Sequence, residues 1–73
     1  MKNMKKVNSL ENVDRLLLEA MESEVKAKEF YLNASSKALS STGKKLFQEL
    51  ANFEQHHYDK LKTIIEKRKQ GLQ

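Results

Sequence analysis

The sequence predicts an all-α chain that folds as an antiparallel two-helix hairpin, and three observations support this prediction. Its 73 residues include no proline and only two glycines, and helix-favouring Ala, Leu, Glu, Lys and Met are abundant. Residues 35–43 form the only stretch rich in turn-forming residues. On both sides of this stretch, apolar residues recur at steps of three and four, which is the spacing of one face of a helix.

The first helix is expected over residues 9–37, after a basic tail at residues 1–8. Asn8 or Ser9 can cap its start, and Glu11 follows Asn8 by three residues, as in a capping box. One stripe along this helix follows alternating steps of three and four, and it is apolar except for one glutamate. The stripe consists of Leu10, Val13, Leu17, Ala20, Glu24, Ala27, Tyr31 and Ala34.

The second helix is expected over residues 42–69, after a turn at residues 38–41 and before a tail at residues 70–73. Gly71 can end this helix. Three neighbouring residues can cap its start, namely Ser40, Ser41 and Thr42. Its stripe has the same stepping and contains two polar residues. The stripe consists of Phe47, Leu50, Glu54, His57, Leu61 and Ile64.

The three polar residues of these stripes are expected at one height of the hairpin. In an antiparallel hairpin centred on residue 39, two residues are level when their numbers add up to about 78, as those of Glu24 and Glu54 do. His57 follows Glu54 by three residues and therefore lies on the same face of its helix. The sequence thus predicts a layer of two carboxylates and one imidazole between apolar layers.

Two hairpins are expected to pair, because one hairpin cannot cover two broad apolar stripes by itself. A homodimer that forms a four-helix bundle, or a higher even oligomer, would cover both stripes. The dimer would bring two copies of Glu24, Glu54 and His57 into one core, with four negative charges if the histidines are neutral. Because burial of unpaired carboxylates is severely unfavourable, protons or metal ions must compensate, and two divalent cations would neutralise the layer.

The ligand types favour particular metals. One nitrogen and several carboxylate oxygens per metal suit iron or manganese, and zinc can also occupy such a site. Carboxylate bundles that bind two irons or two manganese ions have one Glu on each of two helices and Glu-x-x-His on each of the others. Glu24 and the Glu54–His57 pair, each present twice, would provide this set of side chains.

Two motifs carry a family resemblance. Residues 24–31 read E-x-x-A-x-x-x-Y, and Glu54-Gln55-His56-His57 follows on the second helix. Over about residues 17–65 the chain resembles the ferritin-like superfamily, specifically the rubrerythrin-like half-bundle. Its length is similar to that of the encapsulated ferritins, which build their iron sites between two-helix subunits.

The resemblance implies a site and an activity. Glu24, Glu54 and His57 would be iron ligands, with Glu24 or Glu54 bridging two irons, and Tyr31 would donate a hydrogen bond to these ligands. The chain would be an oxidoreductase, either a ferroxidase that oxidises Fe(II) with O2 or H2O2, or a rubrerythrin-like peroxidase that needs an external electron donor. The alternative is a non-enzymatic helical dimerisation module in which the polar layer sets the register.

Composition argues against several other classes of protein. Of the 14 Lys and Arg residues, six lie at the two ends of the chain, and the other eight are outnumbered by ten acidic residues, so a nucleic-acid partner is not expected. No apolar run approaches the roughly 20 residues of a membrane span, and no apolar segment of a signal peptide follows the basic N-terminus. The chain has no cysteine for a thiolate metal centre. A cytoplasmic location is the expectation.

Overall fold

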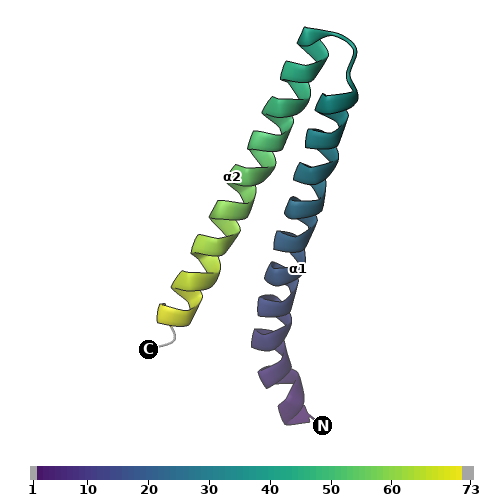
Figure 1. The fold of residues 1–73 in the computed structure, drawn as a ribbon. Helices are drawn as coiled ribbons and strands as arrows, with labels where there is room; N and C mark the ends of the chain where they lie inside the picture. The colour runs from purple at the N-terminus through teal and green to yellow at the C-terminus, as the bar shows by residue number, and fades with distance from the viewer. Residues whose placement is uncertain (1, 72–73) are drawn as a thin grey trace.

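The structure is a hairpin of two long helices. It is a computed structural model that describes the backbone of residues 2–71 and the side chains of residues 11–71. Helix α1 spans Lys2–Lys37 and helix α2 spans Ser41–Gly71. The helices run antiparallel, so the two termini lie at the same end, opposite the turn (Figure 1). The predicted all-α hairpin is therefore confirmed, whereas its pairing into a four-helix bundle stays a prediction.

Both helices extend further than the sequence analysis expected. Helix α1 begins at Lys2, so the expected basic tail at residues 1–8 is helical throughout its described part. Asn8 and Ser9 lie inside α1 and do not cap it, because a capping residue needs a non-helical backbone. Neither proline nor glycine occurs before residue 43, so nothing stops the helix at these positions. At the other end, α2 continues beyond residue 69 to Gly71.

Hydrogen bonds at the start of α2 fix the turn. Ser40 is the capping residue, because its Oγ accepts a hydrogen bond from the Gly43 N–H at 3.0 Å. The Ser40 carbonyl accepts the first helical hydrogen bond, from the Lys44 N–H at 3.0 Å. Ser35 Oγ on α1 donates to the Lys44 carbonyl at 2.9 Å and ties the two helices together beside the turn.

The hairpin is one helix layer thick and buries little of its own surface. Its Cα atoms extend over 56 × 25 × 10 Å, and a depth of 10 Å leaves room for a single layer of helices. Among the residues with described side chains, only Ala51 and Ser35 are buried, with 1% and 5% of their surface exposed. The helices separate toward the ends of the chain (Figure 1). A single copy of residues 11–71 therefore has no hydrophobic core of the size that usually stabilises a domain.

Within residues 11–71, helical spacing divides the exposed large hydrophobic residues of the two helices between two faces of the hairpin, while Leu39 is exposed in the turn. Repeated steps of three, four or seven place six of them on the side of His57, and we call this side the His57 face. These six residues are Val13, Leu16, Phe30, Leu46, Phe53 and Ile64. Three more lie on the opposite side with Tyr58, which we call the Tyr58 face. These three residues are Leu18, Val25 and Leu32.

The remaining surface of both helices is strongly charged, since one third of all residues are Asp, Glu, Lys or Arg. At the open end of the hairpin, Arg68 Nε donates to Asp14 Oδ1 at 2.7 Å and joins α2 to α1. Within residues 2–71, neither helix has an apolar stretch that is long enough to cross a membrane.

Candidate metal centre

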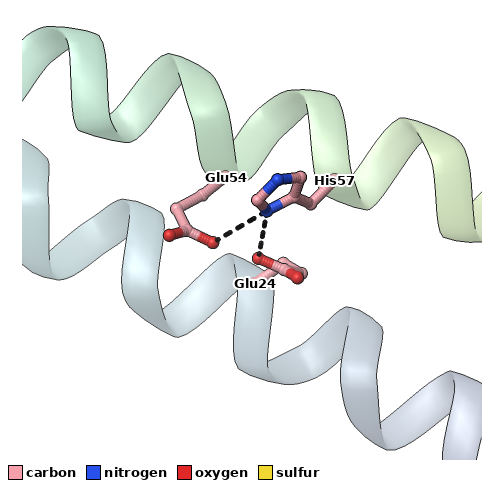
Figure 2. A network of polar contacts seen from close by, with 3 residues as sticks. All are labelled: Glu24, Glu54 and His57. Carbon is pink, nitrogen blue, oxygen red and sulfur yellow. Dashed lines mark ion pairs between the residues drawn. The ribbon is translucent and has the colours of Figure 1, made fainter.

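The structure brings together the three polar residues that the sequence placed at one height. Glu24 projects from the middle of α1 toward α2, and Glu54 and His57 lie on consecutive turns of α2 (Figure 2). His57 Nδ1 lies 3.6 Å from Glu24 Oε1 and 3.8 Å from Glu54 Oε1. Their role as metal ligands stays a prediction.

The distances between these side chains fit a shared metal ion. Both His57 distances are too long for hydrogen bonds. Two atoms that bind one ion at about 2.1 Å each can lie at most about 4.2 Å apart, and both distances are below this limit. One ligand atom from each of the three residues lies within 4.8 Å of the other two. Small side-chain rotations could therefore bring two carboxylate oxygens and one imidazole nitrogen around a divalent ion, and these atoms suit iron, manganese or zinc.

The three side chains differ in their exposure to solvent. Glu24 and Glu54 lie in the seam between the helices, with 21% and 19% of their side-chain surface exposed. The His57 side chain is 57% exposed and lies at the edge of the seam, on the His57 face. Beside it is an open pocket of about 270 Å³ that is also lined by Glu24 and Ile64. This group of three side chains is thus open to solvent on its imidazole side.

Glu54 perturbs the protonation of Glu24. The pKa of Glu24 is raised above its ordinary value, chiefly because hydrogen bonding with the Glu54 carboxyl stabilises the protonated form. Partial burial and repulsion by the Glu54 charge raise this pKa further, while His57 acts in the opposite direction. Glu24 therefore holds a proton more tightly than an isolated glutamate, and a bound cation would have to displace that proton.

Tyr31 lies two helical turns from Glu24 and is part of an aromatic cluster. Its ring stacks on that of Phe47 with centroids 6.4 Å apart, and the Phe30 ring meets it edge-on at 5.6 Å. Among the hydrogen bonds of residues 11–71, none joins the Tyr31 hydroxyl to the three polar residues. The expected hydrogen bond from Tyr31 to the metal ligands stays a prediction for an assembly of two copies.

Sequence reasoning did not identify Lys28 and Gln55 as neighbours of this site. Lys28 Nζ donates to Gln55 Oε1 at 2.6 Å, across the two helices. Both residues line a pocket on the Tyr58 face that is also lined by Glu24 and Glu54. Lys28 follows Glu24 by four residues, and this spacing alone could have placed it on the same side of α1. Its partner on α2 depends on the rotation of that helix, which the apolar pattern does not define closely enough.

Comparison with known proteins gives one match, to a protein family. A family model described as Rubrerythrin matches residues 15–73, a range that includes α2 and all but the first turns of α1. The matched range contains Glu24, Tyr31, Glu54 and His57. Searches of curated proteins and of solved structures returned no significant match.

Proposed function

The chain belongs to the rubrerythrin family, within the ferritin-like superfamily, and on this premise we propose that it binds a pair of iron ions between two copies and oxidises Fe(II). Membership of this family suggests an iron-binding domain. The observation that carries the proposal is the approach of Glu24, Glu54 and His57 to one another between the two helices.

A second copy would complete the proposed centre. One chain offers two carboxylates and one imidazole, whereas a centre with two irons in a carboxylate bundle needs twice this set. Two-fold pairing of the His57 faces would supply the second set and would cover six exposed large hydrophobic side chains on each copy. Each such side chain that is fully removed from water contributes roughly 1.5–3 kcal/mol, so this face favours pairing strongly.

The chain's own residues would bind and surround the metal. His57 would supply the nitrogen ligand of each ion, and Glu24 or Glu54 would bridge the two ions. When bound, iron would supply the electrons: two Fe(II) ions, at one electron each, would reduce H2O2 to two waters or O2 to H2O2, with two protons taken up in either case. Apolar neighbours on the paired faces would limit the access of water.

A peroxidase role would require one more partner. Continued reduction of peroxide needs an external electron donor that returns Fe(III) to Fe(II). A ferroxidase role needs only Fe(II) and an oxidant. Manganese or zinc could occupy the same ligands without this redox cycle.

Fe(II) oxidation together with metal analysis tests the proposal. We expect wild-type protein to bind about one iron per chain and to oxidise Fe(II) at least about ten times faster than buffer. Glu54→Ala should lose both properties. Glu49→Ala, which removes an exposed carboxylate from the same helix, should keep them. Wild-type protein that binds no iron and oxidises Fe(II) no faster than buffer would reject the proposal.

The alternative function is a dimerisation module in which the polar layer only sets the register. It is favoured by the contacts of His57 with both carboxylates, because a protonated His57 would form ordinary ion pairs at these distances. This alternative predicts that the double variant Glu24→Leu, His57→Leu melts at a higher temperature than wild type. It also predicts that iron leaves the melting temperature of wild type unchanged.

A further inference from the structure

A pocket on the Tyr58 face reaches the two carboxylates of the candidate centre from the side opposite His57. We propose that this pocket is the route by which divalent cations reach the centre in the assembled protein. The inference rests on the proposed function, since it presupposes a metal centre between two copies.

The pocket on the Tyr58 face lies against the carboxylates of Glu24 and Glu54. It has a volume of about 270 Å³, it lies between α1 and α2, and Glu24 and Glu54 form part of its wall. His57 does not line it. The pocket beside His57 lies on the His57 face, which a second copy would cover. After pairing, the pocket on the Tyr58 face would therefore be the open path to the same carboxylates.

The charge of the pocket selects for cations. Three carboxylates line it, those of Glu24, Glu29 and Glu54. Lys28 is the one cationic residue among its lining residues. A pocket lined mainly by one sign of charge raises the local concentration of ions of the opposite sign. Divalent cations should thus accumulate here, whereas anions should be repelled.

Lys28 is held in place at this pocket. Its Nζ donates to Gln55 Oε1 at 2.6 Å, and Gln55 Nε2 in turn donates to Asp59 Oδ1 at 2.9 Å. These hydrogen bonds fix the ammonium group of α1 against α2, beside the path to the carboxylates. A fixed positive charge opposes the approach of a divalent cation. Lys28 would therefore slow uptake and would counteract part of the attraction by the carboxylates.

Stopped-flow uptake of Co(II) by the full chain tests the route without any redox step, because Co(II) stands in for Fe(II) and its absorption changes on binding. Leu32→Trp places a bulky side chain at the pocket. Leu18→Trp is the matched control, since Leu18 is also an exposed leucine on the Tyr58 face but does not line this pocket. We expect Leu32→Trp to slow uptake roughly ten-fold or more, with wild-type rates for Leu18→Trp and unchanged Co(II) per chain at equilibrium.

Lys28→Met provides a second, independent measurement that introduces no bulk. It should accelerate Co(II) uptake about two- to five-fold at low ionic strength, and the gain should shrink as salt is added. Unchanged uptake rates in both Leu32→Trp and Lys28→Met, with wild-type Co(II) binding at equilibrium, would overturn the route and leave the proposed function intact. A wild-type protein that binds no Co(II) at equilibrium would reject the proposed function itself.

Discussion

His57 Nδ1 of α2 lies 3.6 Å from the Glu24 carboxylate of α1, so the two helices meet here through polar side chains. This distance is too long for a hydrogen bond and is compatible with a shared metal ion. If such an ion binds, it connects the two helices at mid-height, and stability should depend on it.

Metal binding should stabilise the protein through these side chains. Divalent iron under anaerobic conditions, or manganese, should raise Tm, because a ligand that binds only the folded state stabilises it. At one hundred times Kd the gain is about 2.7 kcal/mol, or a rise of roughly 10 °C or more for a chain of this size. The rise should vanish in His57→Ala and persist in Glu22→Ala, which removes an exposed carboxylate of α1. A wild-type Tm that does not respond to either metal would contradict the prediction.

The metal-free protein should lose stability as pH rises above the ordinary pKa of a glutamate. The pKa of Glu24 is higher in the folded state than in the unfolded state, so the folded state binds this proton more tightly. The resulting stabilisation is fully present below the unfolded pKa and is lost as pH rises through the folded pKa. Because other carboxylates also titrate, the quantity to measure is the difference in unfolding free energy between wild type and Glu24→Gln. The measurement should run from about pH 4, near the ordinary pKa of a glutamate, up to about pH 7.

The free energy of unfolding of Glu24→Gln should increase relative to that of wild type as the pH rises. With metal present, the free energy of unfolding of wild type should instead increase with pH, because the cation competes with protons for the carboxylates. Without metal, the difference in unfolding free energy could instead stay constant over this range, or wild type could gain stability relative to Glu24→Gln as the pH rises. Either result would show that folding does not favour the protonated form of Glu24.

The pairing of two copies should depend on the His57 face. Phe53→Asp places a charge on this face, and it should dissociate the dimer and abolish metal binding, because an unpaired buried charge is severely unfavourable. Leu18→Asp is a matched control on the Tyr58 face, since Phe53 and Leu18 are 58% and 55% exposed. Sedimentation velocity reports the oligomeric state. The proposed interface would be wrong if Phe53→Asp stayed dimeric with wild-type metal content.

The cap of α2 should contribute measurably to stability. Ser40→Ala removes the acceptor of the Gly43 N–H and should cost about 1 kcal/mol. Ser41→Ala removes a neighbouring hydroxyl from the first residue of α2 and should cost much less. Urea denaturation of the two variants measures both effects. Equal losses would indicate that the hydrogen bond seen at Ser40 does not cap the helix.

The hairpin and its polar layer could be predicted because both depend on short-range rules. Helix spacing placed Glu54 and His57 on one face, and the position of the turn brought Glu24 level with them. The start of α1 could not be predicted in this way. Asn8 and Ser9 are good capping residues, yet the residues around them also favour helix, and no chain break forces a choice.

Details that depend on the rotation of one helix against the other were also beyond the sequence. Apolar spacing placed Glu24 and His57 in the same seam, but it did not reveal that Glu24 would be mostly covered and His57 mostly exposed. The hydrogen bond between Lys28 and Gln55 depends on the same rotation. Lysine and glutamine side chains most often face solvent, so the residue types did not predict a contact between the helices either.

An anomalous-scattering map at the iron edge, from crystals grown with Fe(II), tests the central claim most directly. We predict two peaks per pair of chains, each about 2.0–2.2 Å from a His57 nitrogen and from carboxylate oxygens of Glu24 and Glu54. A map without peaks between these residues, with His57 turned to solvent or joined to the glutamates by ordinary ion pairs, would contradict it.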